Sequence, residues 1–169
     1  MNEIDEIERK ISELYDSVPE QILIDVPFSL QFEAWMSFSK SYLSAAAVVE
    51  NEKPQNWLPI RQLLGQSIEL ALKACIFAEK ETPGHGHNLI ELIRICDRKG
   101  YKFKSFDIAA IIHLNHFYFK DLSTESKFKS RYPTNNNEAL GGVVPEVKKY
   151  ASIVDALQKQ AEQKMKLNL

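Results

Sequence analysis

The stretch Glu69–Leu92, ELALKACIFAEKETPGHGHNLIEL, decides the fold of this chain. Its first ten residues are apolar apart from Glu69 and Lys73, and the run stops at Pro83-Gly84 before a second apolar segment begins at Leu89. A helix that is apolar on nearly every side belongs in the middle of a bundle. The few polar residues that such a helix keeps therefore form either a stripe that faces solvent or a site.

Composition places the chain among ordinary globular proteins of one domain. It has 169 residues, of which 44% are hydrophobic and 26% charged, and its net charge is −2, so nucleic acid or an anionic membrane would have to be bound by a local patch. Cys75 and Cys96 lie inside apolar helical patterns, which predicts buried free thiols rather than a disulfide. The N-terminus is acidic and polar, unlike a signal peptide, and no apolar run approaches the roughly 20 residues that span a bilayer. We expect a cytoplasmic protein that makes no contact with a membrane.

Apolar residues recur at helical spacing along most of the chain. The pattern predicts an N-terminal helix over 1–18 and core helices over 28–49, 58–81, 88–99, 105–121 and 145–165. Residues 122–144 lack the helical period and are rich in Asn, Gly and Pro, so they predict a long loop. Because the other connections are mostly short, the fold class is all-α. We expect an antiparallel (up-and-down) helical bundle of about five core helices plus an N-terminal helix. The chain divides into an N-terminal helical extension (1–18) and the bundle (19–169).

Polar side chains form a stripe along the most apolar predicted helix. Gln62, Gln66, Glu69 and Lys73 are spaced by four, three and four residues. One interpretation is a stripe that faces solvent, in which Glu69 and Lys73 form an ion pair of roughly 0.2–0.5 kcal/mol. The other is that the stripe lines a cleft or an interface.

The four histidines occur as two pairs, His85/His87 in a Gly-rich turn and His113/His116 on one face of a helix. The two pairs could bind a metal if the turn folded over that helix, but no Cys or carboxylate completes a familiar ligand spacing, so we predict no metal site. The alternative is that His87 caps a helix and the other histidines lie on helix surfaces or in the core.

Basic and aromatic residues interleave in the long loop, in the sequence FKSRYP over 128–133. Such a segment suits phosphate contact combined with base stacking, although Arg131 and Tyr132 could equally pin the loop to the bundle. No Gly-rich phosphate loop, GxSxG turn or HExxH motif is present.

Three segments in this order resemble the HEPN domain family: Glu69-x-x-x-Lys73, then the GHNLIEL segment over 86–92, then Arg131-Tyr132-Pro133 ahead of the last helix. The resemblance covers about Ser29 to Lys164. It implies a helical bundle that pairs as a homodimer and is either a metal-independent ribonuclease, often a toxin, or a non-catalytic protein. The non-catalytic members bind nucleotides or act with a nucleotidyltransferase.

The ribonuclease members of that family carry an Arg followed, after four to six residues, by a His. Counting from Arg131, the allowed positions hold Asn136, Asn137 and Glu138. The nuclease motif is therefore missing, and the R-Y-P form of Arg131 matches the binding-type branch.

These features lead to a hypothesis of an HEPN-like protein that binds a nucleotide or RNA without catalysis and needs no cofactor. It would act as a homodimer, with a possible toxin–antitoxin pairing with a nucleotidyltransferase. Its ligand-binding residues would be Glu69, Lys73, His87, Arg131 and Tyr132. Lys73 and Arg131 would neutralise a phosphate, Tyr132 would stack on a base, and Glu69 would hold Lys73.

Two alternatives stay open. The first is a metal-independent, toxin-like ribonuclease that uses Arg131 with His87, His113 or His116, because one imidazole and one guanidinium suffice chemically for in-line cleavage. The second is a module that only mediates protein–protein interaction, with the polar residues at a dimer interface.

Overall fold

The computed structural model describes residues 28–54, 57–84, 86–118 and 146–167. Five helices make up this part of the chain: α2 (Phe28–Glu52), α3 (Trp57–Ala78), α4 (Leu89–Arg98), α5 (Ser105–Tyr118) and α6 (Val147–Leu167). The predicted all-α helical bundle is thereby confirmed. The predicted N-terminal helix over 1–18 and the predicted loop over 122–144 lie outside the described residues.

The helix α3 is the centre of the bundle, as its apolar sequence predicts. It contacts each of the other four described helices. Sixteen of its residues are buried, and Ile60, Leu64, Ile68, Leu72 and Cys75 are among the fully buried side chains around which the core forms. A helix surrounded by others needs apolar residues on all its faces, which is the reason for its unusual composition.

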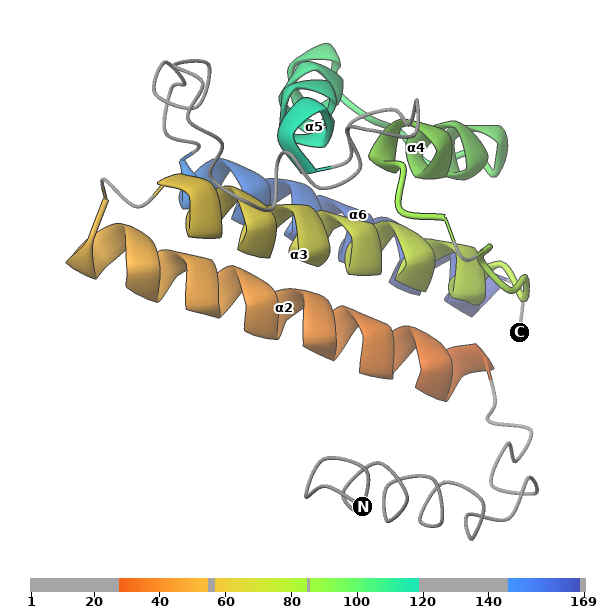
Figure 1. Ribbon diagram of the computed structural model, residues 1–169. Helices are drawn as coiled ribbons and strands as arrows, with labels where there is room; N and C mark the ends of the chain where they lie inside the picture. The colour runs from red at the N-terminus through yellow and green to blue at the C-terminus, as the bar shows by residue number, and fades with distance from the viewer. Residues whose placement is uncertain (1–27, 55–56, 85, 119–145, 168–169) are drawn as a thin grey trace, which may run out of the picture.

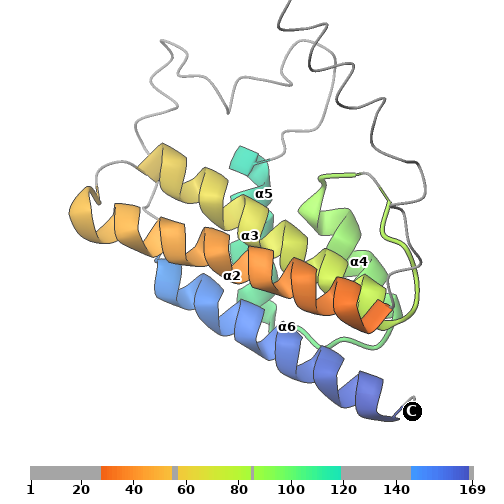
Figure 2. The same ribbon diagram turned by 90° about the horizontal axis from the view of Figure 1, so that it is seen from below.

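The helices form two layers. In Figures 1 and 2, α2, α3 and α6 lie side by side, with α2 antiparallel to the other two. The shorter helices α4 and α5 pack on the face of α3 that is turned away from α2, and α5 runs across α3. The second layer carries the connection between the parallel helices α3 and α6, and it places the end of α5 over the middle of α3.

The helix α3 ends three residues earlier than the predicted end at Glu81. The amide of Glu81 bonds to the carbonyl of Ile76, and that of Lys80 to the carbonyl of Phe77. This pair of bonds is a Schellman motif, and Lys80 adopts the left-handed φ of 59° that the motif requires. The prediction was wrong here because Glu79, Lys80 and Glu81 all favour helix, and only the backbone geometry reveals the stop.

The helix α4 has the ends that its sequence predicts. The Asn88 side chain caps its N-terminus by accepting a hydrogen bond of 3.0 Å from the amide of Ile90. Its C-terminus is a second Schellman motif in which Gly100 takes a φ of 86°, a conformation that glycine adopts without a steric penalty.

Both cysteines are free and fully buried, as predicted. Burial raises the pKa of the Cys75 thiol well above its ordinary value.

Candidate functional site

The polar stripe of α3 does not face solvent in its C-terminal half. Glu69 is 2% exposed and Lys73 is 5% exposed, whereas Gln62 and Gln66 are half-buried. The interpretation of Glu69 and Lys73 as a surface ion pair is therefore wrong. The helical period could not distinguish the two interpretations, since a helix that is apolar all round has no recognisable solvent side.

Glu69 is the hub of a buried polar network. Its Oε1 accepts a hydrogen bond of 2.8 Å from Lys73 Nζ, and His87 Nδ1 lies 3.0 Å from Oε1 and 3.1 Å from Oε2. The hydroxyl of Tyr118 donates to Glu69 Oε2 at 2.6 Å and lies 2.7 Å from Gln66 Oε1. We call these five residues the Glu69 cluster. It joins α3 to the turn before α4 and to the end of α5, so a buried carboxylate is compensated by three donors from three segments.

Local structure places each of these side chains. Gly65 provides the space for the Tyr118 ring, because a Cβ atom built on Gly65 would lie 2.1 Å from Tyr118 Cδ2. The turn that carries His87 is held by Asn115 of α5, whose Oδ1 accepts a hydrogen bond of 2.8 Å from the amide of Leu89. Sequence reasoning missed Tyr118. The available signal was a glycine four residues before Glu69 in a helix otherwise built from larger residues.

Lys73 lies under an aromatic pair. Its Nζ is 5.8 Å from the centroid of the Trp35 ring, and Trp35 packs against Phe77 with 5.2 Å between ring centroids. A cation over the face of an indole is favoured by the ring quadrupole. The ammonium group is thus held between a carboxylate and an aromatic face.

His113 and His116 lie on α5, one helix further along the chain than His87. Both are exposed. Desolvation and the nearby charges of Arg61, His116 and Lys149 lower the pKa of His113. Arg61 precedes Glu69 by eight residues on α3, which is about 12 Å along a helix. His113 therefore lies in a basic group around the start of α3.

Arg61 adds a buried cation that sequence reasoning did not identify. It is 2% exposed, and its guanidinium carbon lies 4.7 Å from the centroid of the Trp57 ring. Burial lowers its pKa from the ordinary value of arginine. Arginine is suited to such positions because its planar cation stacks on aromatic rings.

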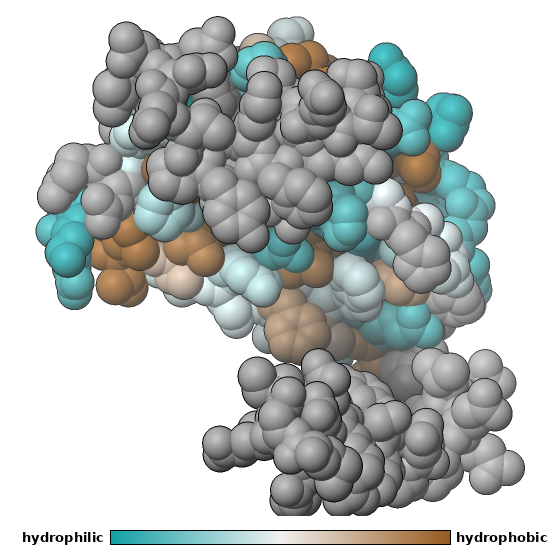
Figure 3. All heavy atoms as spheres, viewed as in Figure 1, coloured by the Kyte–Doolittle hydropathy of each residue, from teal (hydrophilic) through white to brown (hydrophobic). Residues whose placement is uncertain are grey.

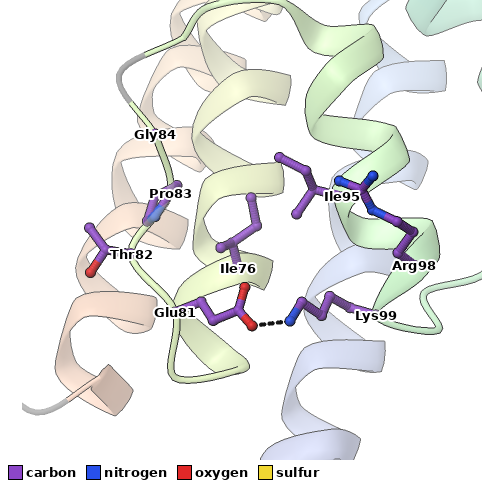
Figure 4. Close-up of a pocket in the computed structure, with 8 residues that line it drawn as sticks. All are labelled: Ile76, Glu81, Thr82, Pro83, Gly84, Ile95, Arg98 and Lys99. Carbon is purple, nitrogen blue, oxygen red and sulfur yellow. Dashed lines mark hydrogen bonds and ion pairs between the residues drawn. The ribbon is translucent and has the colours of Figure 1, made fainter.

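A pocket of about 440 Å³ opens at the C-terminal end of α3. Figure 4 shows its lining, which comes from the end of α3, the turn that follows it and the last turns of α4. Glu81 and Lys99 form an ion pair at its edge. The pocket does not include Glu69, Lys73 or His87, so this hollow is not the predicted ligand site.

The described residues contain no group of three or more His, Cys, Asp or Glu side chains placed to hold a metal ion. His85, one of the four histidines considered for such a site, lies outside the described residues.

The structure brings together three of the five predicted ligand-binding residues: Glu69, Lys73 and His87. Arg131 and Tyr132 lie outside the described residues. Their approach to the Glu69 cluster stays a prediction.

A family model described as the HEPN domain matches residues 32–163, which include all of α3, α4 and α5 and most of α2 and α6. The chain belongs to the HEPN domain family. No match was found among curated proteins or among solved structures. In the part of this HEPN chain that the structure describes, none of the helices combines the length and the hydropathy needed to cross a bilayer.

Proposed function

We propose that this HEPN protein binds a nucleotide or RNA without cleaving it, with the phosphate held beside Lys73 and His87. The observation that carries the proposal is a lysine 5% exposed, held by Glu69, next to an imidazole whose side chain is 53% exposed. Lysines are rarely this buried unless they are paired, and here the pairing with Glu69 fixes the ammonium in one position. The partly open imidazole supplies access to the cluster from solvent.

The cluster has hydrogen-bonding capacity left for a ligand. The ammonium of Lys73 has three donors, and within the described residues one of them bonds to Glu69. His87 uses Nδ1 toward Glu69, and Nε2 on the other side of its ring makes no hydrogen bond to a described residue. Glu69 accepts from all its neighbours and would act on a ligand only by positioning Lys73 and His87.

The charge of the described cluster is not enough for a phosphate by itself. Glu69 and Lys73 cancel each other, so the pair is neutral overall. A phosphate needs further positive charge, which a second cation would provide. This requirement supports a role for Arg131 in the same site, with Tyr132 stacking on the base.

The binding experiment is isothermal titration of the full chain with ATP, other nucleotides and short RNA. We expect binding by the wild type, strong loss in Arg131→Ala and Lys73→Met, and no change in Lys159→Met, which removes an exposed lysine of α6. Circular dichroism shows that each variant is folded. Absence of binding by the wild type, or equal binding by Arg131→Ala, would contradict the proposal.

One observation favours a ribonuclease as the second function. A carboxylate bonded to Nδ1 fixes the imidazole of His87 and leaves Nε2 for proton transfer, an arrangement found in general bases. The base would act together with Arg131, whereas the described charges around His113 include Arg61 and Lys149. Cleavage of labelled RNA by pure wild-type protein, lost in His87→Ala, would establish this activity and exclude the non-catalytic proposal.

We propose further that the protein acts as a homodimer, with a nucleotidyltransferase as a possible partner. Both proposals are supported by what the HEPN resemblance implies, and the family match covers residues 32–163. Light scattering over a range of concentrations tests the dimer. If Lys73→Met and Arg131→Ala change only the mass in solution and no ligand binds, the protein is an interaction module instead.

A further inference from the structure

One face of α2 exposes apolar side chains along almost its whole length. Leu30 is 52% exposed, Phe38 60% and Val48 56%, and the alanines at 34 and 45 are exposed on the same face. Figure 3 shows hydrophobic patches, separated by more polar surface, at the level where α2 lies. The opposite face of α2 packs into the core through its buried residues, among them Phe32, Met36, Ser39 and Ala46. A row of exposed apolar residues on one helix marks a packing surface.

The spacing of this row is that of a coiled-coil seam. The residues at 34, 38, 41, 45 and 48 are separated by four, three, four and three positions and read Ala, Phe, Ser, Ala and Val. A repeat of 3.5 residues keeps a seam turned toward a single partner helix. Three of the five residues are small, which allows the backbone of that partner to approach closely.

The chain carries a matching seam in the residues before α2, which lie outside the described residues. Ile4, Ile7, Ile11, Leu14 and Val18 are separated by three, four, three and four positions. Both seams cover fourteen residue steps, about 21 Å as a helix. The spacings are mirror images of each other, which is the relation that two antiparallel helices need.

The connection between the two seams suits this arrangement. Nine residues, 19–27, separate the end of the first seam from the start of α2, and they include Pro19 and Pro27, which disfavour a continuous helix. Fully extended, nine residues reach about 30 Å, more than the 8–10 Å between the axes of packed helices. In antiparallel packing the first residue of one seam lies opposite the last residue of the other, and so on along both helices. The resulting pairs are Ile4 with Val48, Ile7 with Ala45, Ile11 with Ser41, Leu14 with Phe38, and Val18 with Ala34.

We infer that residues 1–18 form an amphipathic helix that packs antiparallel on the exposed apolar face of α2, in the register that pairs Ile7 with Ala45. The large side chains at 7, 11 and 18 then fit against the small residues at 45, 41 and 34. A segment of the same chain is favoured over a second copy because a short linker gives it a local concentration of about millimolar. This contact is independent of the proposed ligand site.

Cross-linking between engineered cysteines tests the register in the full chain. Ile7→Cys with Ala45→Cys is treated with a short bismaleimide, and the matched control is Ile7→Cys with Ala34→Cys, on the same face of α2 but about 16 Å further along it. The native Cys75 and Cys96 are fully buried, and the wild type shows the background of the reaction. We expect an intramolecular product, identified by peptide mass spectrometry, at least tenfold faster for the first pair.

Three results would overturn the inference: equal rates for the two pairs, no reaction in either, or a product that joins two chains. The last is measured by mixing the single variants Ile7→Cys and Ala45→Cys, and it would assign the α2 face to a second copy. As a check on folding, Ile11→Glu with Leu14→Glu is added to the first pair. These charges lie outside the residues that match the family model, so we expect the bundle to fold normally while the fast reaction is lost.

Discussion

Because the ion pair between Glu69 and Lys73 is buried, we can predict how substitutions of its two residues change the free energy of unfolding. In the wild-type protein, Glu69 has three hydrogen-bond partners, which are Lys73, His87 and Tyr118. Among the described residues, Lys73 forms a hydrogen bond to Glu69 alone. Glu69→Leu therefore leaves a buried ammonium without its counter-ion. We expect this substitution to lower the free energy of unfolding by about 3–5 kcal/mol.

Lys73→Met is expected to be milder, because Glu69 keeps its two other partners. It removes one charge-assisted hydrogen bond, about 1.5–3 kcal/mol, and Met replaces most of the packing of the lysine stem. In the Glu69→Leu background the same substitution removes a stranded charge and should stabilise the protein. The double variant Glu69→Leu/Lys73→Met should thus be more stable than Glu69→Leu alone.

Urea denaturation followed by circular dichroism measures all four proteins of this double-mutant cycle. With a slope of about 2 kcal/mol per molar urea, a loss of 4 kcal/mol moves the midpoint by about 2 M. Effects of Glu69→Leu and Lys73→Met that add within about 0.5 kcal/mol would refute the reasoning, because independent sites add and buried partners do not. A loss below about 1 kcal/mol for Glu69→Leu would show that the pair is solvated after all.

Two further predictions concern the contact between Gly65 and Tyr118 and the pKa of His113. Gly65→Ala should lower the free energy of unfolding by about 1–3 kcal/mol in urea denaturation, because its Cβ would overlap the Tyr118 ring, whereas Gly86→Ala, with nothing within 4 Å, should change it little. Lys149→Met should raise the pKa of His113 in an NMR titration, since Lys149 is one of the charges that lower it. Because this pKa is lowered in the folded state, stability should fall as the pH drops below about 6.5, and the fall should be weaker in Lys149→Met; an unchanged pKa would contradict the assignment.

The helices were predictable because their signals are local. The apolar period gave α2 to α6, and the cap at Asn88 and the glycine at position 100 gave both ends of α4. The end of α3 was not predictable in the same way, because Lys80 takes a left-handed conformation that its side chain does not favour. A C-terminal stop of this kind depends on the packing of the following turn rather than on the residue itself.

The candidate site was predictable in part for a physical reason. Glu69 and Lys73 are one helical turn apart, so their contact follows from spacing, and a His before a capping Asn falls close to the helix start. Tyr118 was missed because its approach depends on how α5 crosses α3, which no local pattern encodes. The burial of Arg61 was not predicted either, because it depends on how the helices pack around the start of α3.

The Glu69 cluster is both a structural joint and a proposed ligand site, and the two roles constrain each other. A carboxylate that links α3, the turn before α4 and α5 cannot move toward a ligand without releasing Tyr118 and His87. Recognition must therefore come from the donors around Glu69, and the carboxylate fixes their geometry before a ligand arrives. Such preorganisation lowers the entropic cost of binding. It also implies that Glu69→Gln, which keeps the shape but removes the charge that holds Lys73, should lower the affinity measured by isothermal titration.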